Sequence, residues 1–122
     1  MEEFDIIEEA KKVFDIEVDA LNKVKDTLDK NFVDIVNMIL NCKGKIIFIG
    51  IGKPGHIAKK LSATFASLGT PSFFLHPSEA QHGDLGMVSK QDVAFVISFS
   101  GESDEVIRIL PNIKKIGTPI TG

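Results

Sequence analysis

The chain has 122 residues, a formal net charge of −3 and 43% hydrophobic residues, with neither Trp nor Tyr and with one cysteine. This length supports one domain with a buried core, and the lone Cys42 excludes an internal disulfide. No apolar run approaches the roughly 20 residues of a membrane span, and the acidic N-terminus does not resemble a secretory signal. We therefore predict a cytoplasmic protein without membrane contact.

The charge is divided unevenly along the chain. Residues 1–34 hold 11 acids and 5 lysines, whereas residues 35–122 hold 6 acids and 9 Lys or Arg. The basic residues of the second part are scattered singly, and no aromatic residues alternate with them, which argues against nucleic-acid binding. A mildly basic segment of this kind suits a small phosphorylated ligand.

Two amphipathic helices, forming an N-terminal helical hairpin, are predicted within residues 1–42. Apolar residues recur every three or four positions between about residues 4 and 28, with acids and lysines between them. A second helix follows, with Asn31 as its N-cap, and ends at residues 41–44. We interpret these helices as a scaffold or an oligomer interface.

Residues 43–122 alternate between strand and helix patterns. Strands are predicted at KIIFI (45–49), SFFL (72–75) and DVAFVI (92–97), and TPITG (118–122) starts a fourth. One helix carries apolar residues at Ile57, Leu61, Phe65 and Leu68. Another begins after Ser103, with Val106, Ile107, Leu110 and Ile113 buried and a kink or early end at Pro111. This alternation predicts an α/β fold, a parallel sheet flanked by helices, with its sites at the carboxyl ends of the strands.

The sequence Gly50-Ile51-Gly52-Lys53-Pro54-Gly55 matches the G-x-G-x-x-G pattern of dinucleotide-binding folds. That fold also places an acid some 20 residues later, and residues 70–75 contain none. Nicotinamide binding is therefore disfavoured, and close approach of the backbone to a ligand is the simplest reason for the glycines. We predict that Lys53 offsets ligand charge, and we interpret His56 as a local hydrogen-bonding residue.

The segment "ISFSGES" (97–103) ends an apolar run with three serines and a glycine, just before a helix. The hydroxyls of Ser98, Ser100 and Ser103, with the N–H groups of the turn, are predicted to hold a phosphate. Two like charges 4 Å apart repel by about 4 kcal/mol at an effective dielectric constant of about 20. The carboxylates of Glu102, Asp104 and Glu105 are therefore expected to point away from the phosphate.

Three segments, GTPSFF (69–74), HGDLGM (82–87) and SGES (100–103), resemble the sugar isomerase (SIS) domain of arabinose 5-phosphate isomerases of the KpsF and KdsD type. The resemblance covers nearly the whole chain and is strongest over residues 50–111. It implies a flavodoxin-like three-layer sandwich, with residues 1–122 as a single SIS domain. It also implies interconversion of D-ribulose 5-phosphate and D-arabinose 5-phosphate through an enediol, a homo-oligomer (dimer or tetramer), and no cofactor.

The resemblance also implies roles for individual residues. Lys53 and Glu105 match catalytic positions, and His82, Gly69 and Thr70 match substrate contacts; we also assign His82 a catalytic role in proton transfer. His76 matches a substrate contact that can also take an inhibitory zinc, although the reaction requires no metal. Together with the residues singled out from the glycine turn and the serine segment, the predicted substrate-binding positions are Gly52, Gly69, Thr70, His76, His82, Ser98, Ser100, Gly101, Glu102 and Ser103.

Two features of the sequence limit what the resemblance implies. Pro54 and Phe99 stand where the family more often has Ser and Asn or Tyr, and the family's other catalytic Glu and His have no counterpart within 122 residues. We therefore expect an incomplete domain that holds part of such an active site and turns over little substrate. The alternative interpretations are a non-catalytic module that binds or senses a sugar phosphate and an isomerase of another phosphosugar.

Overall fold

The computed structural model describes residues 2–99 and 103–122. The chain divides into two compact units, one ending at Asp34 and one spanning Ile35–Gly122. Helix α1 (Glu3–Lys25) makes up most of the first unit and has no buried residue. Its ion pairs lie along its own surface, as between Lys23 and Asp19 at 3.2 Å. The predicted first helix is thus confirmed, three residues shorter at its C-terminal end.

Helix α2 (Lys30–Leu40) starts one residue before the predicted cap. The cap is Asp29, whose Oδ1 accepts the N–H of Asn31 at 3.0 Å, so the assignment of Asn31 as N-cap was wrong. An aspartate in this position satisfies a backbone N–H that the first helical turn leaves without a partner. In the second unit, Met38 and Ile39 of α2 pack against the core of the sheet.

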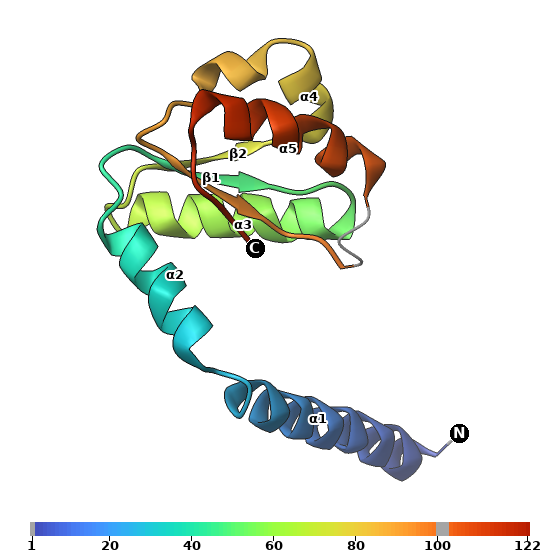
Figure 1. The fold of residues 1–122 in the computed structure, drawn as a ribbon. Helices are drawn as coiled ribbons and strands as arrows, with labels where there is room; N and C mark the ends of the chain where they lie inside the picture. Colours follow the sequence, from blue (N-terminus) through green and yellow to red (C-terminus); the bar gives the residue numbers. More distant parts are fainter. Residues whose placement is uncertain (1, 100–102) are drawn as a thin grey trace. The chain divides into compact units, whose positions relative to one another are not determined.

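The second unit is built on a parallel sheet in the order β2-β1-β3-β4. Its strands are β1 (Ile46–Ile49), β2 (Ser72–Leu75), β3 (Val93–Val96) and β4 (Ile120–Thr121). Helix α3 (Lys53–Ser67) follows β1, α4 (Pro77–Gln81) and the 3₁₀ turn η1 (Asp84–Met87) follow β2, and α5 (Asp104–Ile116) follows β3. Figure 1 shows α3 on one face of the sheet and α4 and α5 on the other. The predicted α/β class is confirmed.

Alternation along β1 divides the core between the two faces of the sheet. Ile46 and Phe48 pack with Ala58 of α3, and the Phe48 ring lies 5.4 Å from that of Phe65. Ile47 and Ile49 belong to the cluster on the opposite face, which includes residues from α4 and α5. All four residues of β1 are buried, as expected for a central strand covered on both faces.

Several predictions about the helices were wrong in detail. Of the four predicted apolar residues of α3, Leu61 and Phe65 pack against the core, but Ile57 and Leu68 are exposed, and the buried residues Ala58 and Ser62 were not predicted. In α5 the buried residues are Val106, Ile109 and Ile113, whereas Ile107 is 45% exposed. Pro111 does not end α5, which continues to Ile116. The proline is itself exposed.

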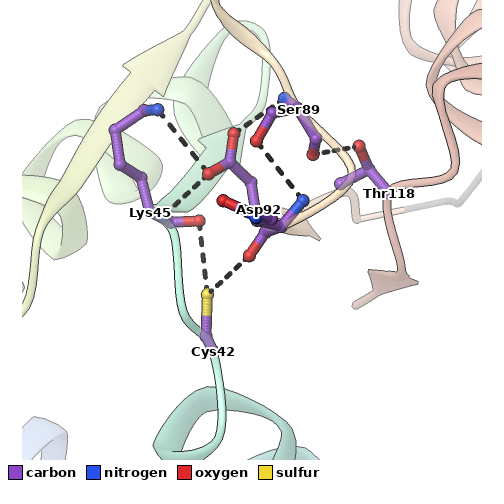
Figure 2. Close-up of polar contacts among 6 residues, drawn as sticks. Cys42, Lys45, Ser89, Asp92 and Thr118 are labelled. Carbon is purple, nitrogen blue, oxygen red and sulfur yellow. Dashed lines mark hydrogen bonds and ion pairs between the residues drawn. The ribbon is translucent and has the colours of Figure 1, made fainter.

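A buried carboxylate joins the segments that lead into β1 and β3 (Figure 2). Asp92, 1% exposed, accepts the N–H of Lys45 at 2.7 Å through Oδ1 and the N–H of Ser89 at 2.8 Å through Oδ2. The Lys45 ammonium lies 3.6 Å from Oδ1. Nearby, the Thr118 hydroxyl donates to the carbonyl oxygen of Ser89 at 2.6 Å, which connects the segment before β4.

The charge of Asp92 is maintained by these contacts. Burial raises the pKa of its carboxyl, but the backbone N–H groups of Lys45 and Ser89, followed by the Lys45 ammonium, lower it further than burial raises it. The pKa of Asp92 therefore lies below its ordinary value. Asp92 is thus an ionised acceptor for two backbone donors near neutral pH.

Within residues 2–99 and 103–122, no helix is long and apolar enough to cross a membrane.

We expect Asp92→Asn to lower the free energy of unfolding by about 2 kcal/mol or more. The amide would turn an N–H₂ group toward one of two buried N–H donors, and leaving a buried donor unsatisfied costs about 1–3 kcal/mol, with a further loss from the charge. Urea unfolding of wild type and variant measures the difference. Asp84→Asn, which changes an exposed acid of η1, is the control and should shift stability by less than about 0.5 kcal/mol. Equal stabilities of the two variants would contradict this role of Asp92.

The contribution of Asp92 should depend on pH. An unfolded Asp has a pKa of about 3.9, and the folded pKa is lower, so the stabilisation is fully present above the unfolded pKa and is lost as pH falls through the folded pKa. The stability difference between wild type and Asp92→Asn should stay constant from pH 7 to about 5 and shrink below about pH 4. Urea unfolding at a series of pH values tests this. A difference that grows on acidification would contradict it.

Candidate functional site

The candidate site lies at the carboxyl edge of the sheet, where β1 and β3 are neighbours. The chain leaves β1 toward α3 on one face and leaves β3 toward α5 on the other, so the two loops diverge at this point. Such a switch point in an open parallel sheet is where ligands bind in α/β folds. A cavity of about 760 Å³ lies there. Its lining residues are Ile51, Gly52, Lys53, Pro54, Ile57, Ile97, Ser98 and Phe99.

The turn between β1 and α3 is shaped by contact between two glycines. A Cβ on Gly50 would lie 2.9 Å from the carbonyl of Pro54 and 3.0 Å from the nitrogen of Gly55, so only glycine fits. Gly52 has φ of 67°, a backbone conformation that favours glycine, and a Cβ there would meet nothing within 4 Å. The expectation that these glycines serve close approach to a ligand is therefore corrected for Gly50 and Gly55, which approach each other.

Two predicted residues face this cavity from different loops. Lys53 is the first residue of α3, and Ser98 follows β3 by two positions. The structure therefore brings Gly52, Lys53 and Ser98 to one cavity. An ammonium and a hydroxyl are the polar groups in a lining that otherwise consists of Ile, Pro, Phe and Gly residues. They can donate to a phosphate or to an oxyanion that forms during a reaction.

The start of α5 places Ser103 beside Glu105. Ser103 is the N-cap by position, as predicted, but its side chain makes no capping bond. Its hydroxyl instead donates to Oε2 of Glu105 at 3.3 Å, and both residues are half-buried. One hydroxyl proton serves one acceptor at a time, so Ser103 can hold either the carboxylate or a phosphate. The predicted residues Ser100, Gly101 and Glu102 lie outside the described part of the chain.

His76 and His82 flank the short helix α4. His76 follows β2 directly, and its Nδ1 accepts the N–H of Ser78 at 3.1 Å. Because Nδ1 is the acceptor, a neutral His76 ring carries its proton on Nε2. His82 is exposed at the C-terminal end of α4. Neither histidine lines the cavity between β1 and β3.

Two predicted substrate contacts lie at the other edge of the sheet. Gly69 and Thr70 lie between the end of α3 and the start of β2, and their N–H groups bond the carbonyl oxygens of Ala66 and Phe65. Strand β2 runs parallel to β1. These two residues therefore belong to the amino edge, whereas Gly52 and Ser98 belong to the carboxyl edge. Within one chain the structure does not bring the two sets together.

The described residues contain no group of three or more His, Cys, Asp or Glu that could hold a metal ion. Zinc capture at Nε2 of His76 would first require that nitrogen to lose its proton, because Ser78 already donates to Nδ1.

Sequence reasoning did not single out Lys59, which lines a smaller cavity together with Gly52, His56 and His76. The available signal was the spacing of three between His56 and Lys59, which places both on one side of a helix.

Comparison with known proteins identifies the family. The model of the SIS domain matches residues 39–122. The chain belongs to the SIS domain family. The resemblance predicted from the GTPSFF, HGDLGM and SGES segments is therefore confirmed.

Named relatives of this SIS domain are sugar-phosphate isomerases. It is 48% identical over 117 residues to the arabinose 5-phosphate isomerase KdsD of Shigella flexneri, covering 96% of this chain and 36% of that protein. It is 49% identical over 102 residues to the arabinose 5-phosphate isomerase KpsF of Escherichia coli, covering 83% of this chain and 31% of that protein. The chain thus spans about a third of the length of these curated relatives.

Solved structures show the same fold. A protein of E. coli CFT073, c3406, solved in complex with arabinose 5-phosphate, superposes with a TM-score of 0.91 at 48% identity, covering 98% of this chain and 64% of that chain. A structure described as a putative sugar-phosphate isomerase of Listeria monocytogenes also gives 0.91, at 32% identity, covering 98% of this chain and 63% of that chain. The three-layer SIS fold is therefore the fold of this chain.

We expect Gly50→Ala and Gly52→Ala to destabilise the domain for different reasons. At Gly50 the new methyl group meets backbone atoms, and overpacking of this kind costs about 1–3 kcal/mol. At Gly52 there is space, but the positive φ strains an alanine by about 1–3 kcal/mol. Gly86→Ala, where φ is not positive and a Cβ meets nothing within 4 Å, is the control. If Gly50→Ala unfolds thermally at the temperature of Gly86→Ala, the packing argument is wrong.

Proposed function

We propose that this SIS domain is part of an aldose-ketose isomerase that interconverts D-ribulose 5-phosphate and D-arabinose 5-phosphate in the cytoplasm. Similarity to arabinose 5-phosphate isomerases, at 48% identity over nearly the whole chain, is the observation that carries the proposal. The cavity at the switch point supports it, because Lys53 and Ser98 line it and the Ser103–Glu105 pair begins the helix that follows β3.

The phosphate would bind at the loop between β3 and α5. The sequence offers serine hydroxyls at positions 98, 100 and 103 and the backbone of Gly101 and Glu102. With the first N–H groups of the 13-residue helix α5, these would be the donors for a dianion. When Ser103 donates to the phosphate, it can no longer donate to Glu105, and the carboxylate loses that hydrogen bond. Phosphate binding would thereby leave that carboxylate oxygen without the serine proton and open to a proton from the substrate.

The chemistry moves one proton between two carbons. Starting from the ketose, Glu105 takes a proton from C1, the electron pair forms the C1–C2 double bond of an enediolate, and a proton returned to C2 gives the aldose. Lys53 offsets the negative charge that develops on the oxygen. His82, exposed beside α4, exchanges the proton between the two oxygens, and Gly52 and His76 contact the sugar. The reaction changes no oxidation state overall and therefore needs no redox cofactor.

A second copy of the chain would be needed to bring Gly69 and Thr70 to the same ligand. These residues precede β2, and a four-residue strand is about 10 Å long, which is comparable to the whole length of a pentose phosphate. One chain cannot hold such a ligand at both edges of its sheet. We therefore propose a homo-oligomer, a dimer or tetramer, in which the partner presents its amino edge to the site.

Glu105→Gln, made in the full-length isomerase of which this domain is proposed to be part, tests the role of the base. The amide keeps the shape of the carboxylate but cannot take a proton, so we expect affinity for arabinose 5-phosphate within about threefold of wild type and exchange of substrate hydrogen for solvent deuterium about 10²–10⁴-fold slower. Calorimetry measures binding, and NMR in D₂O measures exchange. Asp104→Asn, the exposed neighbour, is the control and should leave exchange unchanged. Unchanged exchange in Glu105→Gln would remove Glu105 from the mechanism, and binding by wild type without any exchange would instead identify a non-catalytic sugar-phosphate module.

A further inference from the structure

A second, smaller cavity lies between α3 and the edge strand β2. It has a volume of about 200 Å³ and is lined by Gly52, Gly55, His56, Lys59, Phe74 and His76. The turn between β1 and α3 separates it from the larger cavity, since Gly52 lines both. Pockets for whole drug-sized molecules measure about 300–1,000 Å³. This cavity therefore suits one small chemical group.

The side chains around the cavity are those that bind oxyanions. Three of its six described lining residues are His or Lys, and none is acidic. The Lys59 ammonium lies 5.3 Å from the centre of the Phe74 ring, a cation–π contact that holds the charge at the cavity. Among the described residues no carboxylate lies within ion-pair distance of Lys59, in contrast to Lys45 beside Asp92. Its charge is available to a ligand.

His76 adds a hydrogen-bond donor, because its contacts fix which ring nitrogen carries the proton. Ser78 donates to its Nδ1 at 3.1 Å, which leaves the proton of a neutral ring on Nε2. The His76 ring also stands edge-on to the ring of Phe74, with centroids 6.2 Å apart. Phe74 thus contacts both His76 and Lys59 and holds them at the same cavity.

We propose that His56, Lys59 and His76 form an oxyanion subsite distinct from the serine loop after β3. The distance between the two follows from the order of the strands. Strands β2 and β3 lie on either side of β1, so two interstrand spacings, about 10 Å, separate their ends. The subsite therefore binds a small oxyanion separately from the phosphate that the serine loop is proposed to hold.

Binding of inorganic phosphate tests the subsite without reference to any sugar. In NMR titrations of the wild type, the imidazole signals of His56 and His76 should shift together and saturate. Lys59→Met keeps the length of the side chain and removes the charge, and should weaken this binding about tenfold or more, because charge-assisted hydrogen bonds are the strong ones. Lys60→Met changes the next residue of the same helix, also exposed, and should bind as wild type does. Unshifted imidazole signals, or equal binding by the two variants, would overturn the subsite.

Discussion

A buried carboxylate at the amino edge of the sheet determines how the two central strands are placed. The two oxygens of Asp92 accept N–H groups from the segments that lead into β1 and β3. The strands then pair from Ile46↔Val93 to Ile49↔Val96. A shift of this pairing by one residue would turn every side chain of a strand to the opposite face. The meeting of the loops after β1 and β3 at one cavity thus depends on a contact one strand length away.

The strands were predictable because the sheet is covered on both faces. A parallel strand with helices on both faces of its sheet reads as a continuous apolar run, as IIFI and VAFV do in the two central strands and FFL does in the edge strand β2. The packed side of α3 was only partly predictable, because Leu61 and Phe65 pack against the core as predicted. The contact between Gly50 and Gly55 holds the start of the helix close to the strand, so the small residue Ala58 is buried there while the predicted Ile57 is exposed. Hydrophobic periodicity predicts which positions share one face of a helix, but not how far the helix lies from the sheet.

The candidate site was predictable in position and only partly in composition. Alternating strands and helices place the loops after β1 and β3 at the same edge, which brings Lys53 and Ser98 together. The cluster around Lys59 was not predictable, because its cavity depends on where the Phe74 ring lies. Gly69 and Thr70 were assigned by resemblance to a family, and resemblance does not state which copy of a chain supplies a residue. Because Gly69 and Thr70 precede β2, they lie at the opposite edge of the sheet from Ser98, and only a second copy of the chain could bring them to the same ligand.

The glycine pattern after β1 shows that the same sequence motif can arise for different structural reasons. In a dinucleotide fold one glycine of G-x-G-x-x-G lets the pyrophosphate approach the backbone. Here Gly50 and Gly55 fill that pattern by touching each other, which closes the turn tightly. Gly52, free of that contact, takes a positive φ and directs the chain into α3 at Lys53. The same glycine pattern therefore positions Lys53 and two cavities at one turn. The chemistry of the site comes from the side chains that surround the glycines.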